Sequence, residues 1–517
     1  MSEPALASPP ANTPSPVEPL DEHNVRLLEN VHPPSWINPE PAARYHMVVI
    51  GAGTAGLVSA AGAAGLGARV ALIERHLMGG DCLNVGCVPS KGVIRASRAW
   101  QEARHARERF GAPAVDPRSH GDFGAAMERM RRLRAGISVH DSAQRFSGLG
   151  VDVFLGDGRF VGPDTVEVDG KRLRFRRAVI ATGARAAVPS IPGLAEIGYL
   201  TNETVFNLTR LPERLVVIGG GPIGCEMAQS FARFGSRVTL LDKDGHVLVR
   251  EDADAAEIVQ QAMARDGVHF EFGMNVLEVK ARGVEKVVVF ECGGQRREVV
   301  TDQILIAAGR APNIEGLGLE AAGVRSSHKG VEVDDQMRTS NKNIYACGDV
   351  ATRFQFTHIA DAQARIVIQN ALFFGRAKAS ALTVPWCTYT TPEIAHVGLY
   401  EKDAKEKGIA VDTLTVPLSG VDRAILDGAD EGFLRIHLKK GTDQILGATL
   451  VAEHAGDMIG ELCLAITHGI GLGKIASVIH PYPTQGEVVK KAADLWRRGK
   501  LTPGVKKFFE RWFRVFK

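Results

Sequence analysis

Residues 46–74 read HMVVIGAGTAGLVSAAGAAGLGARVALIE, and this stretch decides the fold. An apolar run leads into a GxGxxG turn, a helix of small residues and a second apolar run that ends in an acid, which is the order of a βαβ unit. Glycines at these positions let the backbone approach a pyrophosphate at the positive end of the helix dipole, and the acid binds a ribose. The residues predicted to hold this first dinucleotide are Gly51, Gly53, Gly56 and Glu74.

A second unit of the same kind spans residues 215–242, LVVIGGGPIGCEMAQSFARFGSRVTLLD, so one chain is predicted to carry two dinucleotide sites. The acid that ends this unit favours a free 2′-hydroxyl and would repel a 2′-phosphate, which predicts NADH rather than NADPH. Lys243 follows directly and weakens this discrimination, and a solvated turn acid is the alternative reading of Asp242. The residues predicted for the second site are Gly219, Gly221, Gly224 and Asp242.

The remaining segments indicate an α/β protein with two Rossmann-like domains and a further α+β domain. Short alternating stretches, VDVFLGDGRFV and DTVEVDGKRLRF, predict an antiparallel meander between the two glycine units. From Val384 onward, strands such as LRIHLKK mix with predicted helices over Gly456–Gly469 and Gly486–Arg498. Residues 1–44 are rich in Pro, Ser and Glu and are predicted to form a mobile arm.

Composition and charge narrow the kind of partner. The chain has 62 basic and 59 acidic side chains among 517 residues, a near balance that argues against nucleic acid and favours a small molecule. Its seven cysteines form a sparse, odd set that indicates a reducing, cytoplasmic location, and the opening MSEPALASPPANTPSPVEP lacks the pattern of a secretory signal. The most membrane-like stretch, Ala55–Ile73, is interpreted as the helix of the first glycine unit, because it consists largely of Ala and Gly and carries Arg69.

Two cysteines, Cys82 and Cys87, lie in the stretch GGDCLNVGCVPSK at residues 79–91. They are separated by four residues near the start of a predicted helix, where the helix dipole lowers a thiol pKa and favours a reactive thiolate. Gly80 permits close approach to a cofactor, and Lys91 would place a cation nearby. The pattern therefore indicates a redox-active pair, and two ordinary core cysteines are the alternative.

With these motifs the chain resembles the flavoprotein disulfide reductase family, the class I pyridine nucleotide-disulfide oxidoreductases, over roughly residues 45–500. Within that family it is most similar to mercuric-reductase-like and dihydrolipoamide-dehydrogenase-like proteins. The resemblance implies FAD at the first glycine loop and NAD(P)H at the second. It assigns substrate attack to Cys82 and flavin contact to Cys87, and it pairs Lys91 with Glu226.

The resemblance also implies further cofactor residues and a division of the chain. For FAD it implies Ala181, Thr182, Gly183, Gly348 and Asp349, and for the pyridine nucleotide Gly309 and Arg310. The implied parts are an arm (1–44), a FAD-binding domain in two pieces (45–190 and 311–380), an NAD(P)-binding domain (191–310), a dimerisation domain (381–500) and a basic aromatic tail (501–517).

The C-terminal motif departs from the family pattern. Members that reduce disulfides end in His-Pro-Thr-x-x-Glu, supplied by the other subunit, whereas this chain has HPYPTQGE. Alignment on Glu487 places Tyr482 where the histidine is expected and leaves His480 two residues earlier. A tyrosine whose pKa is about 10 is a poor general base at neutral pH. The three residues are therefore predicted to complete the site across a homodimer, without a settled division of roles.

These features predict an enzyme in which NADH, FAD and a Cys82–Cys87 disulfide reduce a disulfide or a soft metal ion. No structural metal site is predicted, and the two thiols would contact a soft metal only as substrate. Dihydrolipoamide dehydrogenase activity, quinone or oxidase chemistry at the flavin, and a non-catalytic redox or metal sensor are the alternatives. The tail KKFFERWFRVFK is compatible with an amphipathic helix that docks on the protein itself, on a membrane surface or on a partner.

Overall fold

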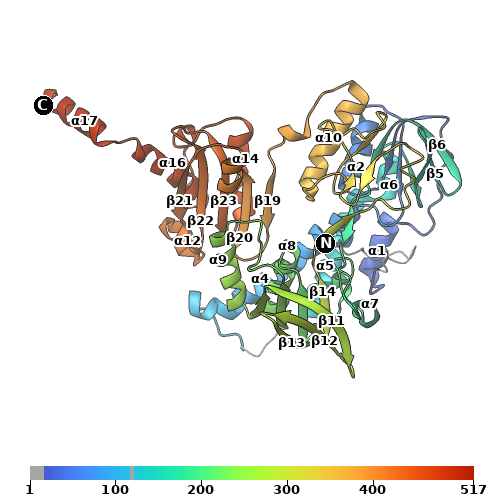
Figure 1. Cartoon of the computed structure of the whole chain (residues 1–517), viewed down its shortest axis with the longest axis horizontal. Helices are drawn as coiled ribbons and strands as arrows, with labels where there is room; N and C mark the ends of the chain where they lie inside the picture. The colour runs from blue at the N-terminus through green and yellow to red at the C-terminus, as the bar shows by residue number, and fades with distance from the viewer. Residues whose placement is uncertain (1–16, 117–120, 517) are drawn as a thin grey trace. The chain divides into compact units, whose positions relative to one another are not determined.

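The computed structural model describes residues 17–116 and 121–516 (Figure 1). The chain divides into two compact units. The first contains the described residues up to Gly245 together with Asp266–Leu382, and the second contains His246–Arg265 and the chain from Thr383 onward. The six-part division expected from the sequence stays a prediction.

The first sheet of unit 1 is built around the first glycine loop. Its strands run in the order β3-β2-β1-β6-β5-β4, with β18 beside β6. Every residue of β2 is buried, as is typical of a parallel strand covered on both faces. Helices α2 (Thr54–Gly65) and α10 (Thr357–Phe373) pack against each other beside this sheet. The parallel strands are β3 (Val151–Leu155), β2 (Val70–Glu74), β1 (Tyr45–Ile50), β6 (Lys171–Ile180) and β18 (Ile344–Ala346).

The predicted meander is only partly correct. Strands β4 (Arg159–Gly162), β5 (Thr165–Val168) and β6 pair antiparallel, as expected. Strand β3 instead pairs in parallel with β2 at the other side of the sheet. Alternation of apolar and polar residues identifies a half-buried strand but carries no information about the direction of its neighbour, so the sequence pattern did not distinguish the two pairings.

The second glycine unit forms its own parallel sheet. Its strands run in the order β10-β9-β8-β14, and α8 (Pro222–Phe234) follows β8. A separate antiparallel sheet has the order β11-β12-β13. The strands are β8 (Arg214–Ile218), β9 (Arg237–Asp242), β10 (Val268–Phe272), β14 (Gln303–Ile306), β11 (Met274–Arg282), β12 (Glu285–Cys292) and β13 (Gln295–Thr301).

The N-terminal segment corrects one expectation. Residues 17–44 were predicted to be a mobile arm, but they contain helix α1 (Glu22–Val31), whose Leu27 and Val31 are fully buried. The Asp21 side chain caps this helix by accepting from the Asn24 N–H, and it pairs with Arg131 of α5 (Phe123–Ile137) at 2.6 Å. Overall composition did not reveal that this segment contains one short amphipathic helix. The remaining part of that prediction, residues 1–16, lies outside the described residues.

Unit 2 is an α+β layer, as the sequence predicted. Its antiparallel sheet has the order β19-β20-β23-β22-β21. The predicted helices near its C-terminal end are observed as α13 (Ala455–Met458) with α14 (Gly460–Thr467), and as α16 (Glu487–Gly499). The other α-helices of the unit are α9 (Ala253–Arg265), α11 (Glu401–Glu406), α12 (Asp422–Asp427), α15 (Leu472–Ile475) and α17 (Pro503–Val515). The strands are β19 (Pro385–Thr388), β20 (Glu393–Gly398), β21 (Val411–Pro417), β22 (Phe433–Lys439) and β23 (Ile445–Ala452).

The membrane-like stretch Ala55–Ile73 is divided between α2 and β2, as interpreted from the sequence. Across the part of the chain that the structure describes, every helix is too short or too polar to cross a bilayer.

Candidate active site

The first glycine loop is pressed against the end of β6. Gly51 has a φ of +99°, and a Cβ there would lie 2.4 Å from the Ala181 carbonyl oxygen. A Cβ at Gly56, in the first turn of α2, would lie 1.8 Å from the Gly51 carbonyl oxygen. Only glycine fits either position, because a Cβ would collide with the backbone that shapes the loop. A tight turn of this kind is the form that binds a pyrophosphate in such units.

Glu74 ends β2 and holds the first loop in place. Its carboxylate accepts from the Ala52 N–H at 2.6 Å and from the His76 N–H at 2.8 Å. Burial raises the pKa of this carboxyl, while these two N–H groups oppose the rise. A carboxylate has about four acceptor positions. Two remain after these bonds, which fits a pair of ribose hydroxyls.

The ends of β6 and β18 bring the other predicted FAD residues to the same edge of the sheet. The Thr182 hydroxyl donates to the Asn313 carbonyl at 2.7 Å, and the Gly348 N–H donates to Gln363 at 2.9 Å. Gly183 and Gly348 both have positive φ values, 69° and 77°. Asp349 follows, and burial raises the pKa of its carboxyl. Because ligands of open parallel sheets bind at the carboxyl ends of the strands, these residues together fit FAD.

Arg310 lies beside the segment that holds the cysteines. Its guanidinium pairs with Asp81 at 2.9 Å and with Asp349 at 3.5 Å, and it donates to the Ala184 carbonyl at 2.8 Å. The family resemblance assigns Arg310 to the pyridine nucleotide, and this assignment stays a prediction. The structure groups the Arg310 side chain with Asp349, a predicted FAD residue, and with Asp81, the acid next to Cys82.

The second glycine loop repeats the geometry of the first. Gly219 has a φ of +115°, and a Cβ there would lie 2.4 Å from the Ala307 carbonyl oxygen. A Cβ at Gly224 would lie 1.9 Å from the Gly219 carbonyl oxygen. Gly221 and Gly309 have open space where a Cβ would be, so both leave room for a bound nucleotide.

Asp242 is the counterpart of Glu74 at the second loop. Its carboxylate accepts from the Gly220 N–H and, at 2.9 Å, from the Asp244 N–H. These bonds hold Asp242, at the end of β9, against the loop, so it is not a freely solvated turn acid. Lys243 is exposed beside it.

The two cysteines lie at a break between helices. Cys82 is in α3 (Gly80–Asn84) and Cys87 begins α4 (Cys87–Phe110), so Cys87 lies at a helix N-terminus, as predicted. Both are free thiols. The Cys87 sulfur lies 3.3 Å from the Thr357 hydroxyl at the start of α10.

The surroundings of Cys87 favour its thiolate. A hydrogen bond from Cys82 lowers the pKa of Cys87, burial opposes this, and the Thr357 hydroxyl and the Lys91 charge lower it further, to about 6. The same contact with the Cys87 sulfur, together with burial, raises the pKa of Cys82. These contacts favour the thiolate on Cys87 and the thiol on Cys82.

The redox segment packs on the first glycine loop. Gly80 has a φ of +58°, and a Cβ there would lie 2.6 Å from the Gly53 Cα. Asn84 donates to the Gly80 carbonyl at 2.8 Å, and the buried Arg134 donates to the Asn84 carbonyl at 2.6 Å. The second terminal nitrogen of the Arg134 guanidinium donates to the side-chain oxygen of Asn24 in α1 at 2.8 Å. The N-terminal helix thus supports the segment that holds the cysteines.

Lys91 and Glu226 form the predicted pair. Their side chains lie 3.0 Å apart, between α4 and α8, and the Glu226 side chain is only 5% exposed. The pair joins the helix that begins at Cys87 to the helix that follows the second glycine loop. This ion pair therefore connects the segment that holds the cysteines to the second glycine unit.

In unit 2 the predicted C-terminal residues each have a different partner. His480 Nε2 lies 3.1 Å from Glu461 of α14. The Tyr482 hydroxyl donates to Asp422 at 2.8 Å, and this hydrogen bond raises the pKa of the phenol. Glu487 begins α16 and lies 3.6 Å from Lys491. A phenol with a raised pKa stays protonated at neutral pH, so Tyr482 in this arrangement is a donor and not a base.

The sequence did not single out three of these contacts. Thr357 is 270 residues from Cys87 in the chain, and a threonine at a helix start has the ordinary explanation of a cap. Asp81 and Glu461 likewise meet Arg310 and His480 only through the fold.

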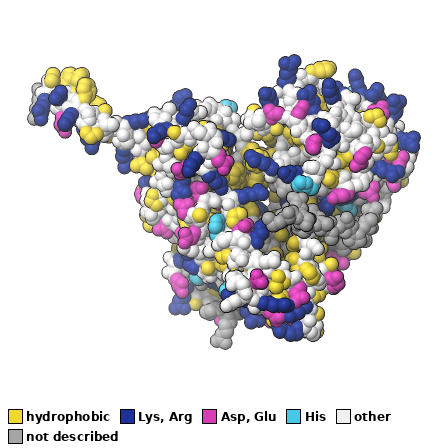
Figure 2. Space-filling view, in the orientation of Figure 1, with side chains coloured by type: hydrophobic (Ala, Val, Ile, Leu, Met, Phe, Trp, Pro, Cys, Tyr) yellow, Lys and Arg dark blue, Asp and Glu magenta, His cyan; other side chains and the backbone are white. Residues whose placement is uncertain are grey.

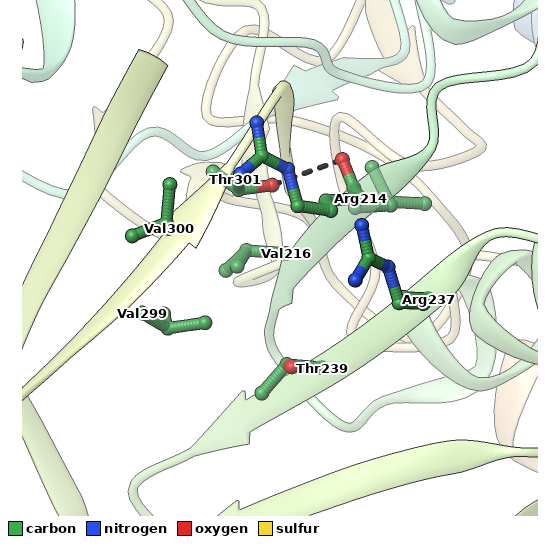
Figure 3. A pocket seen from close by; sticks show the side chains of 8 residues that line it. Arg214, Val216, Arg237, Thr239, Val299, Val300 and Thr301 are labelled. Carbon is green, nitrogen blue, oxygen red and sulfur yellow. Dashed lines mark hydrogen bonds between the residues drawn. The ribbon is translucent and has the colours of Figure 1, made fainter. Parts of the chain in front are cut away.

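A cavity of about 190 Å³ lies elsewhere in the second glycine unit (Figure 3). It is lined by Arg214 and Val216 of β8, by Arg237 of β9 and by Val299 of β13, among others. Arg214 is already paired with Glu285 at 2.8 Å. The lining residues of β8 and β9 belong to the amino-terminal ends of these parallel strands, opposite the glycine loop, so the cavity is not the nucleotide site.

Comparison with known proteins agrees with this geometry. Residues 45–364 match the family described as pyridine nucleotide-disulphide oxidoreductase, and residues 384–493 match its dimerisation domain. The chain belongs to this family. It is an oxidoreductase of the FAD-dependent disulfide reductases, which use pyridine nucleotides.

Several relatives align with most of this chain. Mercuric reductase of Bacillus cereus is 36% identical over 458 residues, which cover 88% of this chain and 72% of that protein. Dihydrolipoyl dehydrogenase of Geobacillus stearothermophilus is 34% identical over 463 residues, covering 87% and 95%. The solved HOCl-induced flavoprotein disulfide reductase RclA of Escherichia coli has a TM-score of 0.77 at 28% identity, covering 87% and 100%. The α/β fold class predicted from the sequence is thereby confirmed.

Proposed function

We propose that this oxidoreductase uses NADH and FAD to reduce a thiophilic acceptor at Cys82 and Cys87, with a soft metal ion such as Hg(II) as that acceptor. Two electrons from NADH convert Hg(II) to Hg(0), and NAD⁺ and one proton are released. Bound FAD supplies hydride acceptance and two-electron transfer to sulfur. The observation that carries the proposal is the Cys87 sulfur at the N-terminus of α4, 3.3 Å from Thr357 and with a pKa lowered to about 6.

The residues of unit 1 support the electron path. Gly51, Gly53 and Gly80 leave bare backbone beside the redox segment, and Glu74 keeps two acceptor positions for a ribose. In the proposed path Cys87 contacts the cofactor as the thiolate, and Cys82 meets the acceptor. Lys91, paired with Glu226, supplies a positive charge that stabilises the Cys87 thiolate.

NADH is proposed as the donor on the basis of Asp242. Two backbone N–H groups fix this carboxylate beside the second glycine loop, where its remaining acceptor positions suit ribose hydroxyls. A 2′-phosphate at the same place would bring two negative charges together. The exposed Lys243 reduces this discrimination without replacing it.

The acceptor is inferred from Tyr482. Reduction of a disulfide requires a base or acid that moves thiol protons, whereas a metal ion that binds thiolates requires none at that position. The Tyr482 hydroxyl already donates to Asp422 and has a raised pKa, which suits a neutral donor in a metal-ion pocket.

A homodimer would bring this residue to the partner's cysteines. The match to a dimerisation domain over residues 384–493 supports such an assembly.

Turnover of Cys82→Ser and Cys87→Ser enzymes tests the proposal. With NADH and thiol-buffered Hg(II), each variant should lose turnover by roughly a thousandfold, because neither can present the dithiol. NADH oxidation by a simple quinone should persist in Cys82→Ser, and Cys463→Ser in unit 2 serves as the matched control. Full Hg(II) turnover in Cys82→Ser would show that the acceptor is reduced elsewhere.

A disulfide is the second candidate acceptor, and the His480–Glu461 pair favours it. A histidine whose Nε2 is held 3.1 Å from a carboxylate has the arrangement of a general base with an orienting acid. Turnover of lipoamide or oxidised glutathione that falls at least about a hundredfold in His480→Gln, while Hg(II) turnover is unchanged, would establish this reading.

A further inference from the structure

Helix α17 (Pro503–Val515) separates aromatic from basic side chains. The Thr502 hydroxyl accepts from the Val505 N–H and Pro503 occupies the first turn, so α17 begins as a helix of its own after α16. Ring centroids lie 6.4 Å apart for Phe508 and Trp512, and 4.5 Å apart for Trp512 and Phe516. The aromatic face consists of Phe508, Phe509, Trp512, Phe513 and Phe516.

These aromatic side chains face water. No residue of α17 is buried in the described chain, and the exposed fractions are 60% for Phe508, 50% for Trp512 and 65% for Phe513. Figure 2 shows hydrophobic side chains gathered along this helix, with basic ones beside them. A contiguous apolar face of this kind on a water-exposed helix marks a docking surface. The expectation that the tail docks on its own chain is not met.

The opposite face of α17 is basic. It holds four basic residues, Lys506, Lys507, Arg511 and Arg514, and one acid, Glu510. At about 100° per residue, Lys506 and Arg511 border the aromatic face on its two sides. Any surface that covers the aromatic side chains therefore also meets positive charge at both edges.

We propose that α17 binds the surface of an anionic lipid bilayer, with its aromatic face among the acyl chains and its basic flanks against the lipid phosphates. Helices with Trp and Phe on one face and Lys or Arg on the other lie in the bilayer interface, and each basic residue adds attraction to anionic headgroups. At 13 residues α17 is too short to span a bilayer, which requires about 20.

Charge argues against a second copy of α17 as the occupant. If two such helices met through their aromatic faces, Lys506 and Arg511 of each would lie beside the same residues of the other. Glu510 lies four residues after Lys506, so it can offset the charge of that residue but not the charge of Arg511 at the other edge. An anionic surface resolves this repulsion, and a second copy does not.

Vesicle co-sedimentation of the FAD-loaded full-length enzyme tests the proposal. Vesicles of phosphatidylcholine with one quarter phosphatidylglycerol should bind the enzyme, and vesicles of phosphatidylcholine alone should bind it at least about tenfold more weakly. Binding should weaken roughly thirtyfold in Lys506→Gln/Arg511→Gln. It should be lost in Phe508→Ser/Trp512→Ser and in the chain truncated after Leu501.

Controls separate lipid binding from folding and self-association. Glu510→Gln should bind at least as tightly as the unmodified enzyme, and all variants should keep their FAD and their NADH turnover with a quinone, since α17 lies outside the catalytic residues. Equal binding to both kinds of vesicle, or binding that survives the truncation, would overturn the proposal. A truncation that changes the oligomeric state without lipid would identify a second copy as the occupant instead.

Discussion

The two glycine loops of unit 1 have the same backbone geometry, although each is predicted to bind a different nucleotide. In each, the first glycine has a positive φ and would place a Cβ 2.4 Å from a carbonyl oxygen of the neighbouring strand end. In each, a Cβ on the third glycine would lie within 2 Å of the first glycine's oxygen, at 1.8 Å for Gly56 and 1.9 Å for Gly224. In each, an acid at the next strand end accepts N–H bonds from the second loop residue and from the residue two positions after itself.

The loops differ in what packs on them. The first has Gly80 of the cysteine-bearing segment against it, and its acid Glu74 is buried. The second is followed by a helix that carries Glu226, and its acid Asp242 is only half-buried next to an exposed lysine. The comparison teaches that the loop determines where a nucleotide can bind, whereas the neighbouring segments determine which chemistry occurs there.

The largest expected effect breaks the first loop. Gly56→Ala should abolish FAD retention and lower the free energy of unfolding by about 3 kcal/mol, because the added Cβ would collide with the Gly51 carbonyl. FAD absorbance per chain and thermal unfolding measure both. Gly65→Ala, on the same helix but in open space, should keep its FAD. A Gly56→Ala enzyme with a full complement of FAD would contradict the prediction.

The matching change at the second loop should have a narrower effect. Gly224→Ala is expected to keep FAD and the reactive thiols but to raise the KM for NADH roughly a hundredfold, because only the second loop is distorted. FAD content, thiol titration and steady-state kinetics separate the two outcomes. Loss of FAD from this variant would mean that the two loops are not independent.

Substitution of the two acids, Asp242 and Glu74, should likewise affect the two nucleotides separately. Asp242→Asn removes the charge that opposes a 2′-phosphate, so the ratio of kcat/KM for NADH over NADPH should fall about tenfold, or roughly 1.4 kcal/mol. Glu74→Gln is the counterpart and should leave this ratio unchanged while weakening FAD binding. Parallel kinetics with both nucleotides test the pair, and an unchanged ratio in Asp242→Asn would assign the selectivity to other residues.

The smallest expected effect concerns the pKa of Cys87, which lies in the segment that packs beside the first loop only. The pKa of Cys87 is lowered to about 6, so its thiolate forms as the pH rises through 6 and is lost below it. Thr357→Val removes a hydroxyl that stabilises the thiolate and should move this midpoint upward by less than about one unit. The pH dependence of alkylation at Cys87 measures it. Thr357→Ser should keep the original alkylation midpoint. An unchanged midpoint in Thr357→Val would show that Thr357 does not stabilise the Cys87 thiolate.

Errors in the sequence-based predictions have physical causes. A composition rich in Pro and Glu predicts a mobile arm over residues 17–44. These residues nevertheless include the amphipathic helix α1, which buries Leu27 and Val31. Strand β3 has the alternation of a meander strand and pairs in parallel.

The sequence by itself determined the two glycine loops, their acids, the cysteine pair and, through the family resemblance, the partnership of Lys91 and Glu226. These are local patterns, since spacing within one βαβ unit or one helix start already constrains the backbone. Only the tertiary structure decided that Thr357 meets Cys87, that Arg310 meets Asp81 and that Glu461 meets His480. Such contacts join residues whose separation along the chain has no period or spacing, so nothing short of the folded packing specifies them.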